Sequence, residues 1–282
     1  MDTPLRLGIS TCLLGEPVRY DGQHKRDRYL TDRLGRYVEY VPVCPEVECG
    51  FPIPRESLRL VGDPDAPRLV TVRSREDHTD RMLDWARKRV KELESEDLCG
   101  FVFKSKSPSS GMERVKVYDA NGMPHKTGVG LFARTFMDHF PDLPTEEEGR
   151  LNDDGLRENF IERIFAMNRW KDTVRNHPSV SALVDFHTRH KLLLMAHSPA
   201  ETTALGRRVA AAADGEPEEV FPPYRSRFMK ALSEPATPEK NTNVLHHIMG
   251  YFKKQLTHDE KTELLEVIET YHNRLVPLIV PV

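Results

Sequence analysis

Three short loops carry the residue types that could perform chemistry, and each follows an apolar run typical of a β-strand. The loops read STCLLG (10–15), PVCPEVECG (42–50) and KSKSPSSG (104–111). Their cysteine, glutamate, lysine and serine side chains offer metal ligands, a general base and hydrogen-bond donors. In an open parallel sheet, ligands collect beyond the carboxyl ends of the strands. We therefore expect the three loops to meet at one edge of a sheet and to build one site.

The chain has four cysteines, and their spacing favours metal binding or catalysis over disulfides. They are Cys12, Cys44, Cys49 and Cys99. We expect a cytoplasmic protein, in which disulfides are rare. No C-x-x-C pairs complete a zinc ribbon, whereas thiolates from separate loops suit an iron–sulfur cluster. From spacing alone, the alternative is that the cysteines are buried as small apolar side chains.

The elements that must position these loops follow a β–α–β succession in the first half of the chain. Apolar runs predict strands over 5–10, 37–43, 99–105 and 114–119, the last closed by an Asn121-Gly122 turn. Helical spacing of apolar residues predicts a helix over 76–97. We therefore expect an α/β N-terminal domain with a mainly parallel sheet, spanning 1–145.

The second half changes character to long helical patterns. Residues 141–155 are polar and rich in Pro and Gly, which indicates a linker. Beyond it, apolar residues recur at helical spacing over 155–174, 179–198, roughly 199–213, 241–256 and 258–275. The sequence therefore predicts an all-α helical domain over 150–282.

Composition limits the classes of partner. The net charge of −3 gives no global sign of a polyanion partner, so any RNA contact needs a local patch and no DNA partner is expected. No apolar run approaches the roughly 18 residues of a membrane span, and MDTPLRLGIS has no secretory pattern. We therefore expect cytoplasmic localisation and no membrane partner.

Long motifs in both halves resemble known families. VPVCPEVECG, STCLLGEPVRYDG and FKSKSPSSG resemble the domain of unknown function 523, which includes thiouracil desulfidases. LVDFHTRHKLLLMAHSP and NVLHHIMGYFKKQL resemble the domain of unknown function 1722. The two in this order resemble bacterial enzymes that remove sulfur from 4-thiouridine in tRNA. The resemblance implies a [4Fe-4S] cluster with three cysteine ligands and one open iron, and tRNA containing 4-thiouridine as partner.

The third cysteine ligand is where this chain departs from the family pattern. Many members read SPSCG, whereas this chain reads SPSSG, so Ser110 stands at the ligand position. We expect Cys49 to replace it, which gives Cys12, Cys44 and Cys49 as ligands. Cys99 begins a strand whose far end, on the order of 20 Å away, carries the SPSSG loop. We therefore expect Cys99 to lie in the core.

The implied exchange of C=S for C=O needs a general base, a hydrogen-bond donor and a cation, and four side chains are candidates for these roles. Glu46 is expected to activate the water that attacks C4 of the pyrimidine. Ser107, with Ser105 as the second candidate, matches the position of a catalytic serine. Lys104 could stabilise developing negative charge. The alternatives are a Glu46 that only pairs with Arg55, serines that only shape a turn, and a solvated lysine.

Two basic stretches are candidates for RNA contact, because they combine cations with aromatic or imidazole rings. The candidate residues in 18–29 and 186–191 are Arg19, Tyr20, His24, Lys25, Arg26, His187, Arg189, His190 and Lys191. A third patch holds His246, His247, Lys253 and Lys254. The alternatives are a solvated basic face for the first stretch and structural histidines for the second.

Three functional hypotheses follow. The first is iron–sulfur-dependent, non-redox desulfuration of 4-thiouridine in tRNA, with the helical domain holding the RNA. The second is the same chemistry on free thiouracil. The third is a non-catalytic protein that binds RNA or another partner, in which Ser110 marks a lost cluster site.

Overall fold

The computed structural model describes residues 4–176, 178–212 and 215–282. The chain forms two compact units, which divide between Asn168 and Arg169 within helix α4 (Asp154–Asn176). The first unit therefore continues past residue 145, where the sequence suggested that its domain ends. Among the described residues, no helix is both long and apolar enough to cross a membrane.

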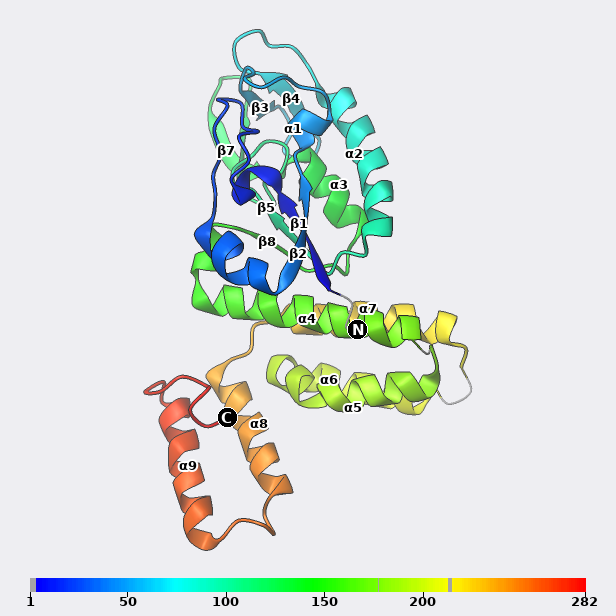
Figure 1. Ribbon diagram of the computed structural model, residues 1–282, viewed down its shortest axis with the longest axis vertical. Helices are drawn as coiled ribbons and strands as arrows, with labels where there is room; N and C mark the ends of the chain where they lie inside the picture. The colour runs from blue at the N-terminus through cyan, green and yellow to red at the C-terminus, as the bar shows by residue number, and fades with distance from the viewer. Residues whose placement is uncertain (1–3, 177, 213–214) are drawn as a thin grey trace. The chain divides into compact units, whose positions relative to one another are not determined.

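The first unit contains a parallel sheet that agrees with the predicted α/β class (Figure 1). Its strands are β1 (Leu5–Ser10), β2 (Val38–Val43), β5 (Phe101–Phe103) and β8 (Thr145–Glu147), in the order β2-β1-β5-β8. All three pairings are parallel, and β1 pairs with β2 along its whole length. The carboxyl ends of β1, β2 and β5 therefore lie at one edge of the sheet.

Strand β8 corrects the expectation of a linker over 141–155. Thr145 pairs with Phe101 and Glu147 with Phe103, and a 3-10 turn (Arg150–Asn152) leads on to α4. Glu146 and Glu147 are buried within hydrogen-bond networks, although their charges suggested solvent exposure. The polar composition of this stretch therefore reflects paired charges in a sheet and not a free linker.

A second sheet lies in the same unit and was not predicted. It contains β3 (Leu58–Val61), β4 (Arg68–Thr71), β6 (Val115–Tyr118) and β7 (Pro124–Gly128), in the order β4-β3-β6-β7. Only β3 and β6 are parallel. The predicted strand over 114–119 is therefore β6 of this mixed sheet, and Gly122 (φ 77°) closes the predicted turn before β7.

Helices α2 (Thr79–Leu93) and α3 (Leu131–His139) pack side by side against the parallel sheet (Figure 1). Their shared core is aromatic, and Phe101, Phe103, Phe132 and Phe136 are fully buried in mutual ring contact. Burying such large apolar side chains is the main stabilising term of a fold. This core packs β5 against α3, and the loop between them carries SPSSG.

The second unit is all-α, as predicted. Its helices after α4 are α5 (Val180–His197), α6 (Pro199–Ala210), α7 (Pro217–Leu232), α8 (Pro238–Tyr251) and α9 (His258–His272). Helix α7 was missed, because Pro222 and Pro223 indicate a break in a helical pattern. Burial of Phe221, Tyr224 and Phe228 against the neighbouring helices outweighs the two prolines.

Candidate functional site

A pocket of about 400 Å³ lies at the carboxyl edge of the parallel sheet, where the loops after β1, β2 and β5 converge. The residues that line it include five of the predicted site residues, which are Cys12, Cys44, Glu46, Lys104 and Ser107. We call it the thiol pocket, after its two cysteines. The expectation that three sequence-distant loops build one site therefore agrees with the structure.

Cys12 and Cys44 are both held by short turns that end their strands. Cys12 lies in the 3-10 turn Thr11–Leu14, which Gly15 closes in the left-handed region at φ 102°. Cys44 is the N-cap of α1 (Pro45–Glu48), and its N–H donates to the Glu48 carboxylate at 2.8 Å. Burial raises the pKa of Cys12 to about 11 and that of Cys44 to about 12. Both are therefore neutral thiols at pH 7, and a metal that binds them must displace their protons.

The structure does not bring Cys49 to this pocket. Cys49 ends helix α1 and packs in an apolar cluster with Phe51 and Met82, and its Sγ lies 3.5 Å from the Arg81 carbonyl oxygen. Five residues along a helical turn rotate a side chain by about 140°, so Cys44 and Cys49 face different surroundings. Cys99 is 1% exposed and also lies outside the pocket, as expected for a core residue.

Ser110 takes the third position beside the two thiols. It is 3% exposed, lines the thiol pocket, and its N–H donates to Ser107 Oγ at 3.2 Å. Within the described residues, no three His, Cys, Asp or Glu side chains form a metal-binding group. The pocket thus offers two thiols as ligands for an iron–sulfur cluster, and thiols suit iron in such clusters. The third ligand position holds a hydroxyl, where the family pattern has a thiol.

The N-terminus of α3 fixes the SPSSG loop. Leu131 N–H donates to the Pro108 carbonyl at 3.2 Å, and Phe132 N–H donates to the Ser109 carbonyl at 2.9 Å. These donors would otherwise lack a partner in the first turn of the helix. A Cβ on Gly130 would lie 2.5 Å from the Ser109 carbonyl oxygen, so only glycine permits this approach.

Glu46 accepts the last hydrogen bond of a short chain that runs from the SPSSG loop through the buried Ser109. Ser109 Oγ donates to Glu46 Oε1 at 2.5 Å and lies 2.9 Å from Ser107 Oγ. Glu46 Oε2 lies 3.8 Å from Cys44 Sγ and 3.7 Å from Arg55 Nη2. Glu46 therefore lies close to both the Arg55 guanidinium and the Cys44 thiol. Sequence reasoning missed Ser109, whose only signal was its place between Ser107 and Ser110.

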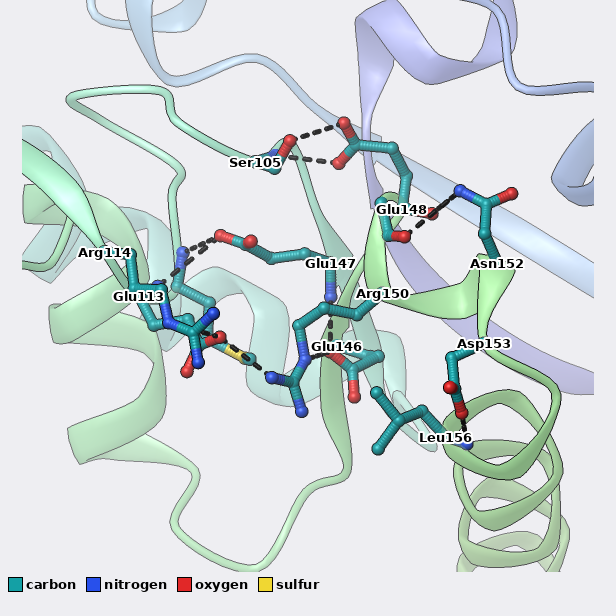
Figure 2. A network of polar contacts seen from close by, with 12 residues as sticks. Ser105, Glu113, Arg114, Glu146, Glu147, Glu148, Arg150, Asn152, Asp153 and Leu156 are labelled. Atoms are coloured by element: carbon teal, nitrogen blue, oxygen red, sulfur yellow. Dashed lines mark hydrogen bonds and ion pairs between the residues drawn. The ribbon is translucent and has the colours of Figure 1, made fainter. Parts of the chain in front are cut away.

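A second carboxylate, Glu148, holds Lys104 and Ser105 (Figure 2 shows the contacts of Ser105). Ser105 donates to Glu148 through its hydroxyl and its N–H, both at 2.7 Å, and Lys104 Nζ forms an ion pair with the same carboxylate. Lys104 is therefore not a solvated lysine. Glu148 was missed because it follows β8, in the stretch taken for a linker.

The candidate RNA-binding residues of 18–29 divide into two groups. Arg19, Tyr20 and Lys25 line the thiol pocket. His24 and Arg26 are exposed outside it, and Arg26 pairs with Asp32 at 2.5 Å. Part of this stretch therefore forms the wall of the site.

The histidines of 186–191 do not form an exposed face. His187 Nδ1 lies 3.0 Å from the Tyr224 hydroxyl, and His190 bonds to the Phe186 carbonyl at 2.8 Å. Both side chains are buried, so their expected place on an RNA-facing surface is corrected to a structural one. Arg189 and Lys191 are exposed, although Arg189 pairs with Asp185.

Two protein families match the chain. The family described as 2-thiouracil desulfurase matches residues 7–148, which contain all three loops of the thiol pocket. The family described as protein of unknown function DUF1722 matches residues 191–282.

Individual proteins are also similar over part of the chain. The uncharacterized protein YbgA of Escherichia coli (strain K12) is 35% identical over 120 residues, which are 42% of this chain and 71% of that protein. The uncharacterized protein YbbK of Bacillus subtilis (strain 168) is 30% identical over 111 residues, or 36% of this chain and 71% of that protein. Among solved structures, the [4Fe-4S]-dependent thiouracil desulfidase TudS is 29% identical, with a TM-score of 0.44, and the match covers 52% of this chain and 93% of that one.

Proposed function

The chain belongs to the 2-thiouracil desulfurase family, and on that premise we propose that it removes sulfur from a thiolated pyrimidine, with 4-thiouridine in tRNA as the substrate. The observation that carries the proposal is the meeting of two buried thiols, Cys12 and Cys44, with the Glu46 carboxylate in one pocket. An enzyme with this substrate would work in the cytoplasm, where tRNA is found.

Cys12 and Cys44 would hold a [4Fe-4S] cluster, with Ser110 at the third position of the same pocket. When bound, the cluster supplies an open iron that draws electron density from the C=S bond, as a Lewis acid does. The reaction needs no net electron transfer, because C=S and water become C=O and hydrogen sulfide.

Glu46 is the general base in this proposal. Its carboxylate takes a proton from the water that attacks the ring carbon, and it returns that proton as the C–S bond breaks. The hydrogen bond from Ser109 and the nearby Arg55 guanidinium fix the carboxylate beside Cys44. Ser107 lines the pocket and donates its hydroxyl proton to Ser109 Oγ, because the Ser109 proton goes to Glu46, so Ser107 must turn away from Ser109 to donate to the ring. Lys104 is oriented by Glu148 and offsets negative charge at the pocket wall.

Two features favour an RNA substrate over the free base. Arg19 and Lys25 add positive charge to a pocket that a neutral base alone would not require. The helical unit presents Tyr251 and Phe252, both exposed, directly before Lys253 and Lys254. Exposed rings beside cations suit single-stranded bases and their phosphates.

The test is sulfide release by protein purified without oxygen, from 4-thiouridine-containing tRNA and from free thiouracil. Glu46→Gln should lower kcat about 10²- to 10⁴-fold with KM nearly unchanged, which is the usual contribution of a general base. Glu92→Gln, at an exposed site on α2, is the matched control. If iron-loaded wild-type protein releases sulfide from neither substrate, the non-catalytic alternative replaces this proposal.

A further inference from the structure

Ser109 is a fully buried side chain between two groups of the proposed reaction. It is 0% exposed and lies behind the wall of the thiol pocket, whereas Ser107 and Glu46 both line that pocket. Ser109 Oγ lies 2.9 Å from Ser107 Oγ and 2.5 Å from Glu46 Oε1. Among the described residues, its hydroxyl bonds to these two side chains alone. A proton that reaches Ser109 therefore comes from one of the two groups and leaves to the other.

The carboxylate fixes the direction of both hydrogen bonds. An ionised carboxylate can only accept, so Ser109 donates to Glu46, and Ser107 in turn donates to Ser109. Both hydroxyls therefore point their protons toward Glu46. Ser107 is the member of this chain whose oxygen can accept a proton from a water molecule in the pocket.

The environment of Ser107 Oγ favours this role. The N–H groups of Ser109 and Ser110 both donate to it, at 3.3 and 3.2 Å. Bonds of this length are weak, so a water molecule can compete with them for the oxygen. The two N–H dipoles also stabilise negative charge on the oxygen as its proton leaves.

Glu46 offers little of its own carboxylate to the pocket. Its side chain is 15% exposed, and Oε1 accepts the Ser109 hydroxyl. Oε2 lies 3.7 Å from Arg55 Nη2 and 3.8 Å from Cys44 Sγ. Both oxygens therefore face protein groups, and the open end of the hydrogen-bonded chain is the Ser107 hydroxyl.

The backbone that carries the two hydroxyls is held in place by helix α3 and by its own turn. The N–H groups of Phe132 and Ala133 donate to the Ser109 carbonyl at 2.9 and 3.1 Å. The Gly111 N–H donates to the Ser107 carbonyl at 2.8 Å. These bonds keep the hydroxyls at a constant separation, which matters because a proton transfers only along an existing hydrogen bond.

We propose that Ser109 relays a proton between Ser107 and Glu46, so that the carboxylate acts on the substrate through two serine hydroxyls. The inference rests on the proposed function and adds the path that its proton takes. Ser109 does not touch the substrate, so it is a positioning residue that also passes the proton on.

The relay moves one proton out and back. As the water oxygen bonds to the ring carbon, water gives a proton to Ser107 Oγ, Ser107 gives its own to Ser109 Oγ, and Ser109 gives its own to Glu46 Oε1. Every hydrogen bond of the chain is then reversed, and Ser107 donates into the pocket without turning away from Ser109.

The return transfer completes the balance of atoms and electrons. Glu46 gives its proton back to Ser109, Ser109 to Ser107, and Ser107 to the sulfur, which leaves with the electron pair of the C–S bond. The second proton of the water passes from the oxygen to the hydrosulfide as C=O forms. No electron is gained or lost.

The experiment measures the rate constant of a single turnover of 4-thiouridine-containing tRNA in mixtures of H₂O and D₂O. Several protons that move in one step make the plot of rate constant against deuterium fraction curved, whereas one proton gives a straight line. We expect a curve for wild-type protein. Ser109→Ala should give a straight line and lower the rate constant about tenfold to one hundredfold, with substrate Kd and bound iron unchanged.

Two further variants separate the relay from a structural role. Ser109→Thr keeps a hydroxyl and should keep the curve. Glu46→Gln/Ser109→Ala should be no slower than Glu46→Gln alone, because residues that act as one unit have non-additive effects. Ser95→Ala, the same change at an exposed site of the first unit, is the matched control.

Each outcome decides between the relay and direct proton transfer to Glu46. A curve that persists in Ser109→Ala protein refutes the relay at any rate constant, and a straight line for wild-type protein refutes it as well. In both cases sulfide is still released, so the proposed function stands with Glu46 as the direct base. If wild-type protein releases no sulfide, the proposed function fails, and the relay fails with it.

Discussion

Single residues decide the character of the site, and Ser110 is the most informative. It lies in the thiol pocket with Cys12 and Cys44, whereas Cys49 is packed into an apolar cluster. A serine hydroxyl is a harder and more weakly acidic ligand than a cysteine thiol, so it should hold iron less tightly. We therefore predict that a cluster binds less firmly with Ser110 at this position than it would with a cysteine.

Ser110→Cys should raise the iron and acid-labile sulfide bound per chain after anaerobic reconstitution, because it completes a set of three thiols. Cys12→Ser and Cys44→Ser should lower both several-fold, while Cys49→Ser should leave them unchanged. Metal analysis and the cluster absorbance measure the result. Circular dichroism checks that the Cys49→Ser protein still folds. If the folded variant loses iron, Cys49 is a ligand and the prediction is wrong.

At the scale of elements, the burial of polar and of aromatic side chains explains most of the differences between expectation and structure. Strand β8 and Glu148 occupy a stretch that reads as a linker, and α7 continues through Pro222 and Pro223. Helix α5 buries His187 and His190 with hydrogen bonds to Tyr224 and to the Phe186 carbonyl. Two predicted surface histidines are therefore part of the core of the helical unit.

This burial predicts a pH dependence for the helical unit. Burial lowers the pKa of both His187 and His190. An unfolded histidine titrates near pH 6.5, so as the pH falls the unfolded chain binds protons before the folded one does. The stability that these groups contribute is present above about pH 6.5 and is lost as the pH falls through their folded pKa values.

Urea unfolding of the full chain between about pH 5 and pH 7.5 measures this loss. His187→Asn/His190→Gln should be less stable at neutral pH, and its free energy of unfolding should change less with pH. His246→Gln/His247→Gln, at exposed positions, should keep the wild-type slope. Equal slopes in all three proteins would show that the buried histidines do not cause the pH dependence.

At the scale of the whole molecule, the chain combines two units with separate cores. The first ends at Asn168 and contains the complete thiol pocket, so the proposed chemistry needs no residue of the second. The second unit carries the exposed run Tyr251 to Lys254. We therefore propose that the helical unit contributes affinity for RNA and that the first unit performs the chemical step.

Lys253→Gln/Lys254→Gln should weaken binding of tRNA and reduce the slope of log K against log salt concentration by about two, because each lysine would neutralise one phosphate. Filter binding at several salt concentrations measures both, and turnover of free thiouracil should stay unchanged. A Lys88→Gln/Lys91→Gln protein, changed on the exposed face of α2, controls for the change in net charge. A wild-type slope in the Lys253/Lys254 variant would exclude this surface from RNA binding.

The sequence by itself determined the α/β and all-α classes, the edge at which the three loops meet, and the presence of Cys12, Cys44 and Glu46 in one site. The classes and the common edge follow from local periodicity and from the rule that parallel strands end at a common edge, whereas the choice of Cys12, Cys44 and Glu46 rested on the resemblance to a known family. Only the tertiary structure decided that Cys49 faces the core and that Ser109 and Glu148 support the site. Those facts depend on side-chain direction and on strand partners distant in sequence, which no local pattern encodes.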